Sequence, residues 1–185
     1  MGRIAAILFS LFLFATLASA QVPASGNVFF GYSYYNTNLS NISRSNLNGW
    51  EGSLEGKILP AVGIVADLSG HYGSQNSVNP ANTCAIGVIC SPLNVSTHIY
   101  EAMFGPRFSA SLGKVRPFAE FEVGVGHINN GLTSDTAFAT AVGGGLDYRI
   151  IRPIAWRFQG DYVSTHFFST YQSNIRLSTG IVVRF

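Results

Sequence analysis

Charge is scarce in this sequence: Lys, Arg, Asp and Glu make up 11% of its 185 residues, while 47% are hydrophobic. A soluble domain usually carries about 25% charged residues, so an ordinary water-exposed surface is excluded. Long hydrophobic runs are missing beyond residue 20, which excludes a membrane protein built from transmembrane helices. An apolar chain without such helices instead indicates a β-barrel whose outer face meets lipid.

Cysteines and cofactor motifs are equally few. Only Cys84 and Cys90 occur, in the sequence CAIGVIC, and two thiols without a nearby His or a third Cys are too few for a closed zinc site. In an oxidising compartment this spacing predicts a local disulfide bond. Phosphate loops, dinucleotide fingerprints and basic patches are absent from the sequence, so no cofactor, metal or nucleic-acid partner is predicted.

The N-terminal segment has the features of a cleavable signal peptide. Arg3 gives a positive start, residues 4–17 are almost entirely apolar, and the sequence ASA at residues 18–20 is a small-residue cleavage site. A membrane-anchoring helix is the alternative, but the run is short for a span. We therefore expect residues 1–20 to be removed and residues 21–185 to form a single barrel domain.

The rest of the sequence predicts eight β-strands. Apolar and polar residues alternate with a period of two in eight segments, which is typical of strands with two different faces. Each segment is long enough for a tilted transmembrane strand, which needs about 9–11 residues. The segments are residues 27–36, 47–58, 61–73, 97–109, 116–127, 136–148, 153–166 and 173–185.

Short and long connections alternate along the chain. Three connections are short: LP at residues 59–60, ASLGKV at 110–115 and RIIR at 149–152. The other four are longer and polar: TNLSNISRSN, the stretch from Ser74 to Ser96, INNGLTSD and FFSTYQ. This alternation predicts an all-β, eight-stranded antiparallel transmembrane barrel of the bacterial outer membrane, with long loops extracellular and both termini periplasmic.

The two faces of the predicted strands identify the barrel interior. One face carries large apolar and aromatic side chains, as a lipid-facing surface requires. The other mixes single charges with small residues, as in Ala139, Ala141 and Gly143, which suits the cramped interior of an eight-stranded barrel. A soluble barrel of lipocalin type is the alternative, but it would leave too little charge on the outside.

Most charged residues fall on the predicted inward face. In so narrow a space they must be paired and hydrogen-bonded, and hairpin register places Asp161 opposite Arg176 and Arg107 diagonal to Glu120. Two interpretations remain open, a salt-bridge network that plugs the barrel and a narrow cation-preferring pore. The predicted interior charges are Glu51, Glu55, Asp67, Glu101, Arg107, Glu120, Glu122, Asp147, Arg157, Asp161, Arg176 and Arg184.

Several stretches resemble the small OmpA-like outer-membrane β-barrel family of Gram-negative bacteria. They are LNGWEGSLEG, GIVADLSGHYGS, FGPRFS, KVRPFAEFEVGVGH, DTAFATAVGGGLDYRI and NIRLSTGIVVRF. The resemblance implies outer-membrane lipid as the surroundings and folding by the barrel assembly machinery. The family's C-terminal assembly signal is matched by Ser178, Gly180, Val183 and Phe185. The resemblance implies no single molecular activity, since such barrels serve as anchors, adhesins, channels or enzymes.

The sequence does not predict an enzyme. Some eight-stranded outer-membrane barrels are lipid A deacylases with a His-x-Ser-Asn signature, whereas the sequence HINNG from His127 has Asn129 in place of the Ser. Without a neighbouring hydroxyl, His127 has nothing to activate. The four histidines are not expected to converge on a metal, because His71 is on the inward face and His98, His127 and His166 are on the outward face.

The expected function is structural or interactive, acts through the extracellular loops and involves no catalysis. The stretch from Ser74 to Ser96 is the predicted contact surface for an extracellular partner, because a disulfide there would present AIGVI as an exposed apolar tip. Packing of this tip on neighbouring loops is the alternative. A narrow cation-preferring channel and a lipid A-modifying enzyme are the other functions considered.

Overall fold

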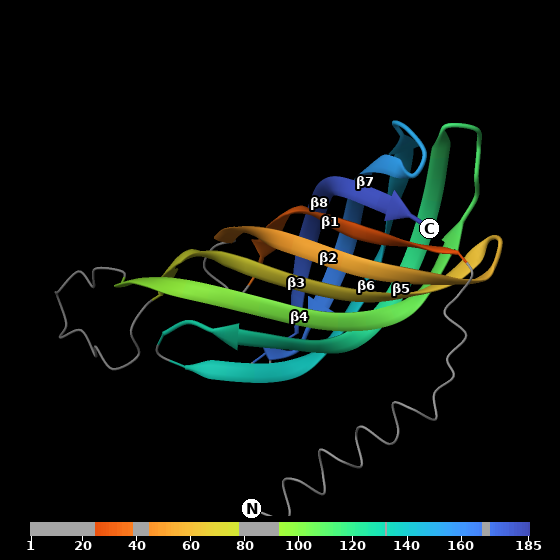
Figure 1. Ribbon diagram of the computed structural model, residues 1–185. Helices are drawn as coiled ribbons and strands as arrows, with labels where there is room; N and C mark the ends of the chain where they lie inside the picture. Colours follow the sequence, from red (N-terminus) through yellow and green to blue (C-terminus); the bar gives the residue numbers. More distant parts are fainter. Residues whose placement is uncertain (1–24, 39–44, 78–92, 132, 168–170) are drawn as a thin grey trace, which may run out of the picture.

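A computed structural model of the chain describes residues 25–38, 45–77, 93–131, 133–167 and 171–185. The predicted fold class is confirmed, since eight antiparallel strands form one closed barrel (Figure 1). The predicted signal peptide, Cys84 and Cys90 lie outside the described residues. The strands are β1 (Gly26–Thr37), β2 (Ser45–Leu59), β3 (Val62–Ser77), β4 (Leu93–Ser109), β5 (Val115–Asn129), β6 (Ser134–Arg149), β7 (Ile154–Thr165) and β8 (Gln172–Arg184).

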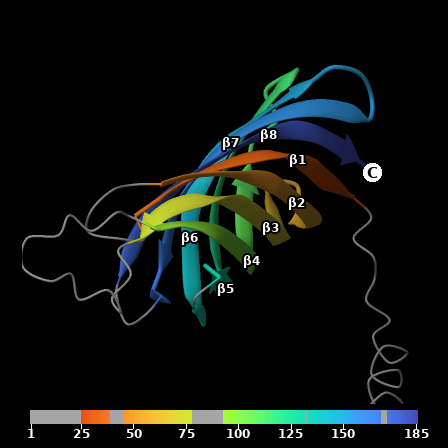
Figure 2. The same cartoon turned by 90° about the vertical axis from the view of Figure 1, so that its left-hand side faces the viewer.

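Each strand pairs with its neighbour in sequence, and β8 pairs with β1 to close the barrel (Figure 2). This up-and-down order satisfies the backbone of every strand on both edges, which lipid demands of any spanning sheet. The short turns after β2, β4 and β6 lie at one end with the start of β1 and the end of β8; we call this the turn end. The opposite end, where the longer connections lie, is the loop end.

The seam between β1 and β8 is tight. Gly26 and Phe185 exchange two backbone hydrogen bonds, with N···O distances of 2.9 and 3.1 Å. Further along, Gly31 is paired with Gly180, and a Cβ atom on Gly31 would lie 2.8 Å from the Cα of Gly180. Glycine is needed at this point because the two backbones approach too closely for a side chain.

The strands extend further at the loop end than the alternation pattern predicts. The predicted loop from Ser74 to Ser96 is wrong at both ends, because Ser74–Ser77 belong to β3 and Leu93–Ser96 belong to β4. These residues pair in register, with Ser74 opposite Ser96 and Ser77 opposite Leu93. Backbone hydrogen bonding continues the ladder regardless of side-chain polarity, so the two strands extend into the stretch that was expected to be a loop. The connection therefore spans residues 78–92, outside the described residues.

The outer surface of the barrel is apolar. Phe30, Phe104, Phe138 and Leu54 are each more than half exposed. Most large exposed hydrophobic residues lie on the outward face of the strands, alternating with the buried positions, so the molecule is inverted relative to a soluble protein. Among the described residues, no helix has the length and hydrophobicity needed to cross a membrane.

Candidate functional site

The middle of the barrel interior is built around one guanidinium, that of Arg176 on β8. Its nitrogens lie 2.8 Å from Asp67 and 2.9 Å from Asp161. Three more carboxylates stand at 3.4–3.8 Å, those of Glu51, Glu101 and Glu122. Arg176 and Asp161 are directly paired on β8 and β7, whereas the others reach it across the barrel. We call these six residues the Arg176 cluster; all six are buried.

Neutral side chains satisfy part of the excess negative charge in the Arg176 cluster. Tyr35 donates its hydroxyl to Glu101 at 2.7 Å, Ser69 donates to the same carboxylate at 3.2 Å, and Gln159 donates to Glu51 at 3.0 Å. Glu122 differs, because neither of its carboxylate oxygens has a hydrogen-bond partner in the described part of the chain. Among the described residues its one ion-pair contact is with Arg176, at an N···O distance of 3.8 Å.

A second charged layer lies nearer the turn end, and we call it the turn-side cluster. Arg107 contacts Glu120 at 2.5 Å and Glu55 at 3.4 Å, and Arg157 contacts Asp147 at 2.7 Å. The predicted diagonal relation of Arg107 to Glu120 is wrong, because the two are directly opposite in the β4–β5 register. The remaining contacts are Lys57 with Glu55, Arg184 with Asp147, and both buried arginines with the ring of Phe118.

An apolar layer lies on the loop-end side of the interior, beside buried polar residues such as Gln172 and Asn174. Buried residues from six strands and from the β7–β8 connection pack together there: Tyr35, Leu47, Ile99, Met103, Ile128, Ala139, Ala141, Val163 and Phe167. Phe167 was expected in a polar loop, but it is fully buried. Its ring occupies the space beside Gly126, where a Cβ atom would lie 2.9 Å from the ring. Hydrophobic burial draws this loop residue into the barrel mouth.

Of the twelve predicted interior charges, the structure places eleven in buried positions and Arg184 in a partly exposed one. Sequence reasoning missed Lys57, which is two residues after Glu55 on the same face and pairs with it. It also missed the polar partners Asn27, Ser33, Tyr35 and others. Period-two alternation from Glu55 would have found Lys57, and alternation along β1 would have placed Asn27, Ser33 and Tyr35 on the inward face.

The histidines do not form a metal site. His71 is buried and contacts Ser33 at 2.9 Å, whereas His98, His127 and His166 are outside the core. Within the described ranges, no group of three or more His, Cys, Asp or Glu is arranged to hold a metal ion. The expectation that His127 lacks a hydroxyl neighbour is wrong, because its Nδ1 lies 2.7 Å from the Oγ1 of Thr136 on the adjacent strand. The β5–β6 register brings the pair together.

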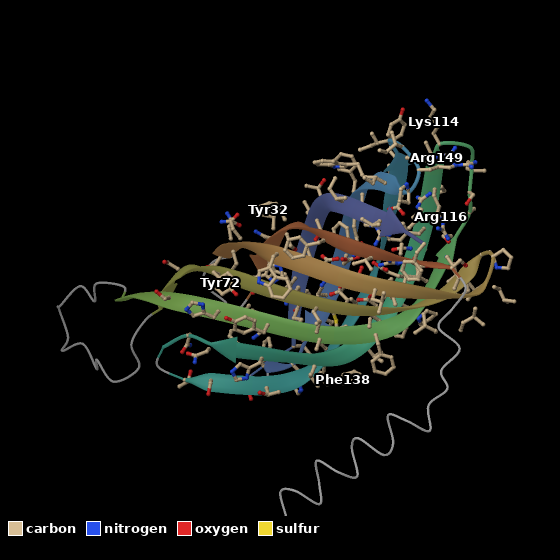
Figure 3. All side chains as sticks on the ribbon, in the orientation of Figure 1. Tyr32, Tyr72, Lys114, Arg116, Phe138 and Arg149 are labelled. Atoms are coloured by element: carbon tan, nitrogen blue, oxygen red, sulfur yellow. The ribbon has the colours of Figure 1, made fainter. Side chains whose placement is uncertain are left out.

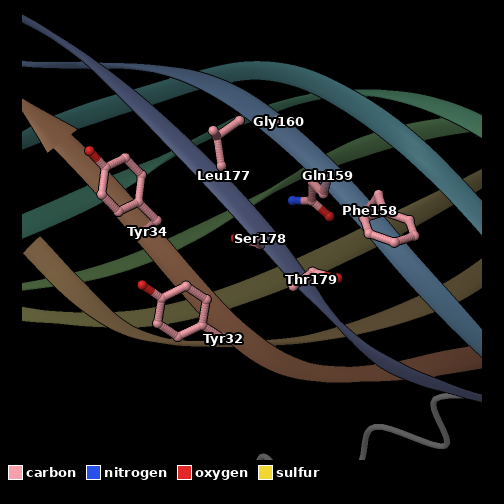
Figure 4. A pocket seen from close by; sticks show the side chains of 8 residues that line it. All are labelled: Tyr32, Tyr34, Phe158, Gln159, Gly160, Leu177, Ser178 and Thr179. Carbon is pink, nitrogen blue, oxygen red and sulfur yellow. The ribbon is translucent and has the colours of Figure 1, made fainter.

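A groove on the outer surface crosses β1, β8 and β7 (Figure 4). Its volume is about 530 Å³, and it opens above Gly160 and Thr179, where the outward side chains are small. Tyr32, Tyr34 and Phe158 stand around it. Acids, bases and thiols are absent from its lining, so the groove offers shape for an apolar chain but no catalytic group.

Aromatic residues with polar tips lie toward both ends of the outer surface. At the loop-end side, Tyr32 donates to Asn48, and Tyr72 packs edge-on against Tyr100 (Figure 3). Nearer the turn end, Trp156 donates its indole N–H to Thr179 at 2.8 Å and is paired with Tyr148. Two such aromatic bands with an apolar surface between them are typical of barrels that span a bilayer.

Comparison with known proteins gives structural matches only. Neisserial surface protein A is similar over 88% of this chain and 99% of its own, with 12% identity and a TM-score of 0.65. The outer membrane protein OprG from Pseudomonas aeruginosa is similar over 87% and 95%, with 8% identity and a TM-score of 0.64. The fold is that of the small outer-membrane β-barrels.

A third solved structure extends the comparison. Ail, the attachment invasion locus protein of Yersinia pestis, is similar over 87% of this chain and 98% of its own, with 13% identity and a TM-score of 0.55. No protein-family model and no curated protein matches the sequence. The likenesses establish the transmembrane barrel fold, and the functional argument must come from the residues themselves.

Proposed function

We propose that this protein is an integral outer-membrane barrel that acts through its loop end, in a structural or surface-interaction role without catalysis. We propose that the barrel is oriented with its loop end outside the cell and its turn end in the periplasm. The observation that carries the proposal is the filled interior, which leaves the surfaces of the barrel as the places where it can act.

Three layers of buried side chains follow one another along the described barrel. The turn-side cluster is followed by the Arg176 cluster, and the apolar layer with Phe167 covers the latter on the loop-end side. An eight-stranded barrel has an interior just wide enough for its own side chains. Here those side chains are large and cross-connected, as in the contact of Arg176 on β8 with Asp67 on β3 at 2.8 Å.

The loop end is almost free of formal charge, which limits the partners it suits. Its connecting segments contain one formally charged residue, Arg44, and Asp135 is the second residue of β6. Residues 78–92 contain no charge and include Cys84 and Cys90 around AIGVI. Ail has been crystallised with sucrose octasulfate, a heparin analogue. A polyanion of that kind has little to pair with here, so we propose a partner bound by apolar and uncharged hydrogen-bonding contacts.

The proposal is tested by replacing residues 80–91 with a short Gly-Ser linker. Cells that express the native protein in a Gram-negative host should adhere to a partner surface, and the variant should lose this adhesion. The variant must still show heat-modifiable migration on gels, because the barrel strands end at Ser77 and resume at Leu93. Unchanged adhesion by a folded variant would contradict the proposed role of this loop.

Assembly is the second part of the proposal, with the barrel assembly machinery as the partner. Ser178, Gly180, Val183 and Phe185 lie on the strand that closes the barrel and would direct it to that machinery. Deleting Phe185 is expected to reduce the amount of folded barrel in the membrane several-fold, while Phe185→Tyr keeps the aromatic ring and should assemble normally. Normal assembly of the deletion variant, measured by heat-modifiable migration, would refute this role.

A cation-preferring channel is the alternative that one observation favours. The Arg176 cluster holds five carboxylates against one guanidinium, so any ion that passed would be a cation. The packing described above supports a closed interior over a channel, and single-channel recording decides between the two.

A lipid A-modifying enzyme is supported less well. The His127–Thr136 contact supplies a hydroxyl and a base, but within the described residues no carboxylate lies within 4.0 Å of His127 to orient it. Nucleophilic catalysis normally requires that third group. A shifted lipid A mass on expression, lost in His127→Ala, would establish the enzyme instead.

A further inference from the structure

The basic residues of this protein are gathered at the turn end. The sequence contains 11 Lys and Arg, one of them Arg3 in the predicted signal peptide. Of the other ten, three are buried inside the barrel, and Arg44 is in the sequence between β1 and β2, outside the described residues. The remaining six lie in the turns or in the last strand residues of the turn end: Lys57, Lys114, Arg116, Arg149, Arg152 and Arg184.

Two neighbouring turns present the most accessible of these charges. The β4–β5 turn carries Lys114 and the β6–β7 turn carries Arg152, both exposed, with Arg149 half-buried between them. Figure 3 shows Lys114, Arg149 and Arg116 close together at this end. The Arg149 N–H donates to the Lys114 carbonyl at 2.8 Å, so the two turns are joined by the backbone.

These charges are not neutralised by the protein. All nine Asp and Glu of the sequence lie in the described residues, and none is within 4.0 Å of the charged nitrogens of Lys114, Arg116, Arg149 or Arg152. The acids nearest this end, Glu55 and Asp147, are buried in the turn-side cluster. The two turns therefore present basic side chains that have no ion-pair partner among the protein's own acids, whereas Lys57 and Arg184 are paired with Glu55 and Asp147.

Apolar side chains stand beside the charges on the same two turns. Leu112, Ile150 and Ile151 are 66%, 54% and 58% exposed. They belong to ordered backbone, since Leu112 and Val115 exchange hydrogen bonds and Ile150 and Ile151 both donate to the carbonyl of Ile154. Exposed apolar groups next to basic ones match the boundary between acyl chains and headgroups of a bilayer.

We propose that these two turns form a binding surface for anionic phospholipid headgroups of the adjacent leaflet, which in the proposed orientation is the periplasmic one. We call this surface the basic platform: Leu112, Lys114, Arg149, Ile150, Ile151 and Arg152. Lys114 and Arg152 pair with lipid phosphates, and Arg can do so through two parallel N–H donors. The apolar members insert among the first methylenes. The platform anchors the barrel at a fixed depth and enriches anionic lipid around its turn end.

The two tryptophans of the sequence make the proposal testable without knowledge of orientation. Trp156 lies two residues after the start of β7 at the turn end, and Trp50 lies in the loop-end half of β2. The substitution Trp50→Phe leaves Trp156 as the only tryptophan, and Trp156→Phe leaves Trp50. Both variants are reconstituted in bilayers containing brominated phosphatidylglycerol or brominated phosphatidylcholine, which quench only nearby tryptophans.

The expected result is a preference at one end only. Lipid association measured at Trp156 should favour phosphatidylglycerol by about fivefold, the factor that one additional basic contact provides. Association at Trp50 should show no preference. In Lys114→Gln/Arg149→Gln/Arg152→Gln the preference at Trp156 should disappear, while Arg44→Gln leaves it unchanged. In the protein with the native basic residues, high salt should weaken the preference for phosphatidylglycerol at Trp156.

Three outcomes would overturn the proposal. Equal preference at Trp50 and Trp156 would mean that the effect is not located at the platform. If the folded triple variant still prefers phosphatidylglycerol at Trp156, the three basic side chains are not responsible for the preference. Abolition of the preference by millimolar inorganic phosphate, with phosphate binding equally well in the absence of phospholipid, would identify a free-anion site instead. Heat-modifiable migration of each variant verifies folding.

Discussion

The two charged layers of the barrel interior are built from the same residue types but balanced differently. The turn-side cluster sets three carboxylates against four basic side chains, and two of its arginines also pack on aromatic rings. The Arg176 cluster sets five carboxylates against one guanidinium. In the first layer Glu55 and Asp147 each contact two basic side chains and only Glu120 relies on one, whereas all five acids of the second layer depend on Arg176.

This difference shows how a narrow barrel can be closed by polar groups. A buried charge without a partner costs several kcal/mol, so an interior of ionisable residues is stable only as a connected network. Hydroxyl and amide groups such as those of Tyr35 and Gln159 extend the network around Arg176. The redundancy of the turn-side cluster and the dependence of the other on Arg176 lead to predictions of different size.

The largest effect is expected for Arg176→Met, which keeps much of the side-chain volume and removes the only cation of its layer. Breaking a buried pair by removing one partner costs about 3–5 kcal/mol, so the free energy of unfolding in vesicles should fall by that amount. Urea titration followed by tryptophan fluorescence measures it. A loss below about 1 kcal/mol would show that the five carboxylates do not depend on Arg176.

A smaller effect is expected for Arg107→Met in the turn-side cluster. Glu55 retains Lys57 and Asn27 as partners, so only Glu120 loses its main contact. The free energy of unfolding should fall by about 1–3 kcal/mol, the cost of one unsatisfied buried group. Both variants are measured by the same urea titration. If Arg107→Met loses as much free energy of unfolding as Arg176→Met, or more, the two layers do not differ in the way described.

Two neighbouring carboxylates on β5 sharpen the comparison. Glu122→Gln should leave stability unchanged or raise it by about 1 kcal/mol, because it removes one of five like charges and breaks no hydrogen bond. Glu120→Gln should lower stability by about 1–3 kcal/mol, because it weakens charged hydrogen bonds from Arg107. Urea titration measures the free energy of unfolding of both variants. If both substitutions lower it, or both raise it, the balance of charge in each cluster does not determine how much each carboxylate contributes to stability.

The sequence predicts which residues face inward more readily than which of them touch. Alternation from Glu120 to Glu122, or from Arg157 to Asp161, identifies the face because strand side chains repeat with a period of two. Hairpin register also pairs Asp161 with Arg176 and could have paired His127 with Thr136.

Contacts across the barrel were beyond sequence reasoning. Arg176 reaches Asp67 and Glu101 on strands that are not its neighbours, and this depends on how closure and strand tilt align the layers. The inward position of Phe167 depends on the path of a loop, which alternation does not encode. The length of β3 and β4 was underestimated because the residues next to their connection, Ser74–Ser77 and Leu93–Ser96, lie in a long stretch rich in turn-forming residues, whereas the strand pairing continues through them.

Single-channel recording of the refolded native protein in a planar bilayer tests the central claim, that side chains close the interior. Heat-modifiable migration must first establish that the sample is folded. The account predicts no resolved conductance steps, because the turn-side cluster, the Arg176 cluster and the apolar layer around Phe167 fill successive levels of the barrel. Reproducible steps with cation preference, reduced in Glu120→Gln or Glu122→Gln, would contradict it and establish a channel.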